Sequence, residues 1–199
     1  MKPTSSLLRR NPAALIACCW FATIYSMNAV ESLVVCSPNG SHLATAADNG
    51  RIQYRTAVDN TTEHTFYICH PQAIAFSVDG SLLAAAGGLN GSRAKIKVWR
   101  IGDHKELCGI VTAGQGVNAL ALSSDGSLVA GVSSDGRLEV WRVSDGQSQW
   151  SRTLSSAVRS IRFSSDSKRV LIQAENESAR QFGAGNGRLM TDLGVAPKR

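Results

Sequence analysis

The stretch Leu122-Ser-Ser-Asp-Gly126, followed by Ser134-Asp-Gly-Arg-Leu-Glu-Val-Trp141, decides the fold of this 199-residue chain. Its first part recurs as Cys36-Ser-Pro-Asn-Gly40, Phe76-Ser-Val-Asp-Gly80 and Phe163-Ser-Ser-Asp-Ser167. The four copies begin 40, 46 and 41 residues apart. Self-similarity at such a period is typical of repeat architectures, in which each repeat forms one small structural unit.

A second landmark follows the first at a nearly constant distance. Arg55, Trp141 and Phe182 lie 19 residues after the start of their copies, whereas Trp99 lies 23 residues after its own. The second copy therefore holds a four-residue insertion, which we expect to form a loop over Gly87–Ala94. Turn residues follow each second landmark after four more positions, so three landmarks keep a common register.

Between the landmarks, each repeat divides into four short strands. In the third repeat we predict strands at 117–122, 128–132, 138–143 and 149–154, because apolar runs there are separated by Asp, Asn and Gly. The Asp-Gly pairs suit tight hairpins, since Gly tolerates a positive φ. Runs such as Leu82–Ala86 are apolar on both faces of the expected sheet. Each sheet therefore needs a neighbour on either side, which radial stacking provides.

The phrase Phe-Ser-x-Asp-Gly-Ser-Leu-x-Ala and the later Ser-Asp-Gly-Arg-Leu-Glu-Val-Trp resemble the WD-repeat family, and the resemblance covers residues 30–193. It implies an all-β fold of four-stranded antiparallel blades. The sequence departs from the family pattern at Arg100 and Arg142, which follow Trp where the family has Asp, and at Arg55, which replaces Trp. The Gly-His pair before each first strand is also missing. The family's Asp–His–Ser–Trp hydrogen-bond network is thus incomplete, and the resemblance implies blades held mainly by apolar packing.

We expect four repeats over residues 30–71, 72–115, 116–156 and 157–193, followed by a tail over 194–199. The residues to which we assign structural roles are core aromatics and turn residues. They are Phe76, Trp99, Trp141, Phe163, Asp79, Gly80, Asp125 and Gly126.

Four repeats also predict an incomplete ring. The propellers that the chain resembles usually close with about seven blades, within a general range of about four to eight. Four blades would form an open arc, a partial propeller whose first and last blades expose apolar faces carrying Leu33, Val35, Ile161 and Phe163. Such faces favour self-association or packing against additional blades.

Residues 1–29 have the order of a targeting segment. Lys2, Arg9 and Arg10 precede the apolar run 13–25, as in a secretory signal peptide. A membrane anchor extending to Val30 and lipidation at Cys18 are alternatives, as is packing of this segment on the blades. We expect the protein to be exported, to the periplasm or outside the cell, or membrane-anchored, with any membrane link through this segment alone. It would be cytoplasmic if the segment is not a signal.

Charge and cysteine patterns exclude several other classes of function. The net charge is +6, but three basic residues precede the first acid, Glu31, and the remaining excess is only three. Without a run of Lys and Arg, we expect no nucleic-acid partner. The five cysteines form no Cys-x-x-Cys pair and have no suitably spaced His, so we expect no metal and no cofactor.

The sequence shows no pattern typical of catalysis. None of His42, His64, His70 and His104 lies in a motif that pairs it with a nucleophile, and we expect solvated surface histidines. Each Asp of the Asp-Gly pairs is explained by its turn. We therefore interpret the chain as a non-enzymatic scaffold that binds a protein partner. The alternatives are a propeller-type hydrolase and a regulatory propeller fragment of a larger enzyme.

In the family that the chain resembles, the connections between second and third strands share one rim with those that join successive blades. We expect this rim to bind the partner, because loops on a rigid scaffold commonly carry recognition. The candidate residues are Asn49, Leu89, Asn90, Arg93, Gln115, Ser134 and Asn176.

Overall fold

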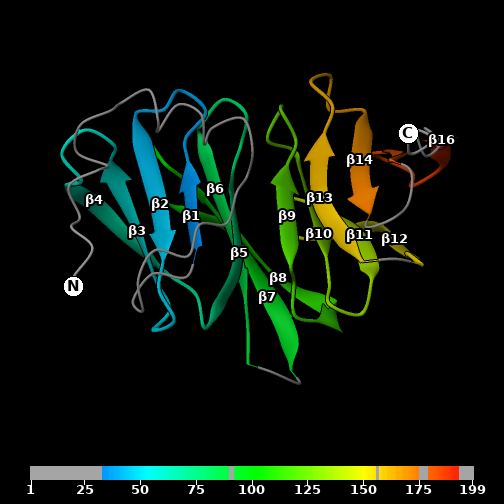
Figure 1. Cartoon of the computed structure of the whole chain (residues 1–199), viewed down its shortest axis with the longest axis horizontal. Coiled ribbons are helices and arrows are strands. Elements are labelled where there is room, and N and C mark those ends of the chain that lie inside the picture. The colour runs from blue at the N-terminus through cyan, green and yellow to red at the C-terminus, as the bar shows by residue number, and fades with distance from the viewer. Residues whose placement is uncertain (1–32, 90–91, 156, 175–178, 193–199) are drawn as a thin grey trace, which may run out of the picture.

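The computed structural model describes residues 33–89, 92–155, 157–174 and 179–192. The segment 1–29 that we expect to be a targeting segment, the tail 194–199, Asn90 and Asn176 lie outside these ranges. The described residues form sixteen strands in four antiparallel sheets of four strands each (Figure 1). No helix in these ranges has the length and hydropathy needed to cross a membrane. The all-β prediction is confirmed.

Each sheet takes its four strands in chain order. The first sheet contains β1 (Leu33–Cys36), β2 (His42–Ala46), β3 (Arg51–Thr56) and β4 (Thr62–Tyr67). The second contains β5 (Pro71–Phe76), β6 (Leu82–Gly87), β7 (Arg93–Arg100) and β8 (Glu106–Gln115). The third contains β9 (Ala119–Leu122), β10 (Leu128–Val132), β11 (Arg137–Arg142) and β12 (Ser148–Thr153). The fourth contains β13 (Val158–Phe163), β14 (Arg169–Ala174), β15 (Arg180–Gly183) and β16 (Leu189–Asp192).

The sheets stack in sequence through their first strands. β1 lies against β5, β5 against β9, and β9 against β13. The first and fourth sheets lie at opposite ends of the row (Figure 1). The four blades therefore form an open arc, which confirms the prediction of a partial propeller.

Opposite faces of each sheet contribute different side chains to these contacts. The face toward the following sheet carries small residues, such as Ala84 of β6 and Ala130 of β10. The face toward the preceding sheet carries aromatic residues, with Trp99, Trp141 and Phe182 at equivalent positions of three sheets. All five are at most 4% exposed. Three apolar layers thus lie between the four sheets. This agrees with the expectation that apolar packing, rather than a buried hydrogen-bond network, holds the blades together.

The apolar residues expected at the open ends of the arc point inward instead. Leu33 is buried and Val35 packs on the core between the first and second sheets. Ile161 is buried and Phe163 packs on the core between the third and fourth sheets. The prediction that these four residues form exposed end faces is therefore wrong. The reason is the alternation of side chains along a strand, which places them on the faces that do have a neighbour.

The insertion in the second repeat also differs from the expected loop. Gly87 ends β6, whereas Arg93 and Ala94 belong to β7, so the connection covers only residues 88–92. β7 and β8 are the longest strands of the molecule's described part, with 8 and 10 residues. Part of the insertion thus extends a strand pair, because β8 continues to Gln115 and gives Arg93 a pairing partner.

A serine fixes the first turn of each repeat. The Ser77 hydroxyl donates a hydrogen bond to Asp79 at 2.5 Å and accepts one from the Leu82 amide at 2.9 Å. Ser123, Asp125 and Leu128 repeat both contacts in the third sheet. The hydrogen bond from Ser77 is the main cause that lowers the pKa of Asp79. These aspartates hold turns, in which Gly80 and Gly126 adopt φ values of 73° and 70°.

In the fourth repeat, Ser167 stands where the others have Gly. It adopts a φ of 58°, a conformation that is costly for a residue with a side chain. Its hydroxyl accepts a hydrogen bond from the Asp125 amide of the third sheet at 3.0 Å. The serine therefore links two neighbouring sheets at a contact that glycine could not make.

Trp141 fills the layer between the second and third sheets and is 3% exposed. Trp141→Ala should lower the free energy of unfolding by about 3–5 kcal/mol, since a large cavity would remain between two sheets. Urea unfolding followed by circular dichroism would measure it. Val58→Ala is the control, because Val58 is 97% exposed and its loss should leave stability unchanged. A loss below about 1 kcal/mol for Trp141→Ala would contradict the assigned packing.

Two histidines stack between the first and second sheets. The rings of His64 on β4 and His104, in the turn after β7, lie 3.9 Å apart with 5° between their planes. Phe66 contacts both rings. Burial, and then the nearby His104, lower the pKa of His64 from its ordinary value of 6.5. Protonation of this pair would place like charges in van der Waals contact.

We expect the contribution of neutral His64 to the free energy of unfolding to be fully present above pH 6.5 and to fall as the pH drops below it. The reason is that His64 in the unfolded state then binds a proton that it resists in the folded state. Thermal melting between pH 7.5 and 5.5 would measure this loss. His64→Phe keeps a stacked ring and should reduce it. His70→Asn replaces an exposed histidine at a positive φ and should leave the pH dependence as in the unaltered protein. Equal effects of the two changes would contradict the interpretation.

Candidate functional site

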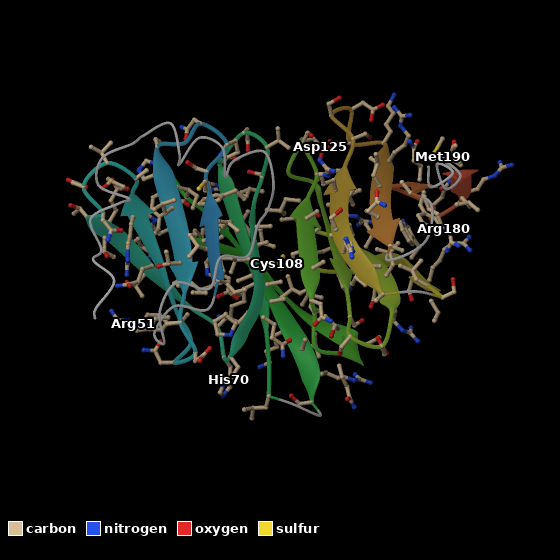
Figure 2. All side chains as sticks on the ribbon, viewed as in Figure 1. Arg51, His70, Cys108, Asp125, Arg180 and Met190 are labelled. Carbon is tan, nitrogen blue, oxygen red and sulfur yellow. The ribbon has the colours of Figure 1, made fainter. Side chains whose placement is uncertain are left out.

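The connections between strands gather at two opposite edges of the arc. Figure 2 shows Asp125, in a first turn, at one edge, and Arg51 and His70 at the other. This second edge carries the β2–β3, β6–β7 and β10–β11 connections and the links between successive sheets. We call it the link rim. The described candidate binding residues belong to these segments.

Three of the candidates come together where the second sheet leads into the third. Arg93 begins β7 and pairs in register with Gln115, the last residue of β8. The Gln115 carbonyl accepts hydrogen bonds from the Ser134 hydroxyl at 2.5 Å and from the Ser134 amide at 3.4 Å. All three residues are exposed. The link between two sheets is thereby fixed to the turn of the next sheet.

The remaining described candidates lie on other turns of the link rim. Leu89, in the β6–β7 connection, is 59% exposed, and its carbonyl accepts two hydrogen bonds from Ser92 at 3.0 and 2.7 Å. Asn49, in the β2–β3 turn, is exposed and its side chain accepts a hydrogen bond from the Arg51 amide at 3.1 Å. In the part of the chain that the structure describes, Asn49 makes no hydrogen bond or ion pair with Arg93, Gln115 or Ser134.

Gln72 belongs to the same region and was not predicted from the sequence. Its side-chain oxygen accepts a hydrogen bond from the Val117 amide at 3.0 Å, which joins the second sheet to the third. Gly116 lies between them with a φ of 63°, and a Cβ there would approach the Ser134 hydroxyl to 3.1 Å. Only the polarity of Gln72 within the apolar run Pro71–Phe76 could have signalled this role.

The junction between the first and second sheets repeats this arrangement. The Gly88 amide donates to the His70 carbonyl at 3.3 Å, as the Ser134 amide does to Gln115 one repeat later. A Cβ at Gly87 would lie 2.3 Å from the Cys69 carbonyl oxygen, so only glycine fits there. These two links between sheets are therefore held against the following sheet by backbone hydrogen bonds, which fixes the backbone of this part of the link rim.

The histidines are less exposed than expected. The His42 ring lies 4.6 Å from the Tyr54 ring in a stack and 3.2 Å from a Glu63 carboxylate oxygen. His104 is half-buried, and its Nδ1 atom is buried without a hydrogen-bond partner in the described structure. The prediction of solvated histidines is therefore wrong for His42 and His104. Their rings are stacking elements between strands and sheets.

The described residues show no cluster of three or more His, Cys, Asp or Glu that could hold a metal ion. No disulfide bond joins Cys36, Cys69 and Cys108, the cysteines in these ranges, to one another. Burial, together with the charges of Glu106 and Asp145, raises the pKa of Cys108 to about 11. At neutral pH this thiol is protonated and therefore a poor nucleophile.

Comparison with known families gives one match. Residues 106–142 match the family described as WD40: WD domain, G-beta repeat. The matched segment begins on β8 of the second sheet and ends on β11 of the third. One sequence repeat thus includes the link fixed by Gln115 and Ser134. No curated protein matches the chain.

The matched repeat agrees with the geometry that surrounds it. Its strands belong to sheets of four antiparallel strands, and the same strand order occurs in all four sheets. Residues 106–142 are therefore similar to a WD repeat, and the four sheets around them form a partial β-propeller, which is consistent with that similarity.

Proposed function

We propose that this protein is a non-enzymatic scaffold that binds a protein partner on its link rim. Blades of the WD type generally mediate protein–protein interactions, and this supports a binding role. The observation that carries the specific proposal is the cluster of Arg93, Gln115 and Ser134, three exposed polar residues whose backbone is held by strand pairing and by the hydrogen bonds of the Ser134 hydroxyl and amide to the Gln115 carbonyl across two sheets. Such a surface loses little conformational entropy when a partner binds, because it is already ordered.

The chemistry of the link rim fits a protein partner. Leu89 offers an exposed apolar side chain next to strand β7, on which Arg93 of the polar cluster lies. Arginine is enriched at protein interfaces, so Arg93 also fits a protein partner. Tyr67, at the end of β4, is 61% exposed and begins the link from the first sheet. Aromatic residues of this kind often contribute strongly to binding at interfaces.

Leu89→Ser should weaken capture of the partner at least about fivefold, since a solvent-exposed apolar contact of the link rim would be lost. Immobilised full-length chain would be incubated with extract of the source cells, and captured proteins would be quantified by mass spectrometry. Val78→Ser is the matched control, because Val78 is 60% exposed but lies in a first turn at the opposite edge.

A partner that depends on Leu89 but not on Val78 would support the proposal, and its binding could then be measured in purified form. Equal capture by all three proteins would place the partner away from the link rim. Arg93→Gln tests the polar cluster in the same assay and should also reduce capture, because it removes a charged side chain next to Gln115.

A further inference from the structure

The fourth sheet has a face that no other sheet covers in the described structure. Register places Ser160 with Gln173, and Arg162 with Leu171 and Gln181, on one side of the sheet. Arg169 shares this side, because it lies two residues from Leu171 on β14. The opposite side carries Ile161, Val170 and Phe182 of the core shared with the third sheet. We call the first side the far face. Figure 1 shows this sheet at one end of the arc.

The far face differs in kind from the equivalent faces of the other sheets. In the third sheet, the four equivalent positions are apolar. They are Ala121, Ala130, Val132 and Val140. The second sheet has Ala75, Ala84, Ala86 and Val98 there. The fourth sheet has Arg162, Leu171, Gln173 and Gln181.

Another blade of the same kind would not pack well on this face. Its aromatic face would bury the guanidinium groups of Arg162 and Arg169 and two amides without supplying partners for them. Burying unpaired polar groups costs several kcal/mol, and a buried unpaired charge costs more. The far face therefore ends the apolar stack, as the polar outer faces of terminal repeats do in other repeat proteins.

The far face is nevertheless shaped for a contact. It contains a hollow of about 350 Å³. The lining residues are Arg162, Phe163, Ser164, Arg169, Leu171 and Gln181. Half-buried Leu171 lies between the two arginines, so an apolar centre has a cationic border. Arg169 lies 3.7 Å from Asp166, and no described carboxylate lies within ion-pair distance of Arg162.

We propose that the far face of the fourth sheet docks an acidic protein segment, with carboxylates on Arg162 and Arg169 and an apolar side chain over Leu171. A guanidinium binds a carboxylate through two parallel hydrogen bonds, and apolar centres with polar borders are typical of protein interfaces. Single-stranded nucleic acid would require exposed aromatic stacking platforms, and Phe163, the aromatic residue that lines the hollow, instead packs on the core shared with the third sheet. This surface is separate from the link rim and does not depend on the function proposed there.

Ring closure by a second copy is a poorer fit to the same face. The opposite end of the arc carries Arg55 at the position where other sheets carry Trp99 and Trp141. Stacking that end on the far face would bring the Arg55 guanidinium beside those of Arg162 and Arg169. Like charges brought together at an interface oppose association.

The test uses the full chain and two fluorescein-labelled peptides of equal length, one of leucines flanked by glutamates and one with glutamine for each glutamate. Fluorescence anisotropy should show binding of the acidic peptide only. Arg162→Gln should weaken it roughly tenfold, the effect of losing one charge-assisted hydrogen-bonded pair. Arg51→Gln is the control, because it removes the same charge from an exposed position on the first sheet (Figure 2). Thermal melting would verify that both variants fold.

Each other result would overturn the proposal. An acidic peptide that does not bind, or that binds equally to the Arg162 and Arg51 variants, excludes specific docking at the far face. Preferential binding of poly-uridylate that Arg162→Gln abolishes would show a nucleic-acid surface. Sedimentation of the chain alone as a dimer that Arg162→Gln dissociates would show that a second copy occupies the face. Arg93→Gln should not change peptide binding, which separates this outcome from that of the link rim.

Discussion

The packing of one sheet's small residues against the next sheet's aromatic residues is the constraint on which the arc depends. Ala130 of the third sheet leaves space that Phe182 of the fourth can use, and Ala84 stands in the same relation to Trp141. Because the two faces of a blade differ, stacking has a direction. Both faces are apolar and must be covered by another sheet, so no single sheet would be stable without a neighbour.

Polar groups keep this apolar stack in register at its two edges. At one edge, Ser77 and Ser123 anchor the first turns, and the Ser167 hydroxyl joins neighbouring turns. At the other edge, Gln72 of the second sheet and Ser134 of the third attach the link between these two sheets to both of them. These short-range hydrogen bonds take over the part that a long buried network would play. The turns and links are therefore held without that network, because their polar atoms find partners close by.

Local sequence pattern predicted the blades well because strand period and turn chemistry are properties of neighbouring residues. Expected strands of the third repeat differ from β9–β12 by at most two residues at either end. Pattern could not show which face of a strand meets a neighbour, so Ile161 was placed at an open end. The pattern also missed the contact of His64 with His104, because the two residues belong to different sheets and no sequence motif links them. Arg93, Gln115 and Ser134 were predicted as one rim from strand order, but their hydrogen bonds required the structure.

The positions of charged residues within the repeats carry information that composition does not. Arg55 and Arg162 occupy slots that are apolar in the interior sheets, and each lies on an end face of the arc. A random surface substitution would fall equally on any exposed strand, whereas both of these fall where stacking must stop. An arginine has a long apolar stem, so it can cover part of an exposed face while its charge stays in water. On the far face, this property leaves the exposed Arg162 guanidinium to a partner that supplies a carboxylate.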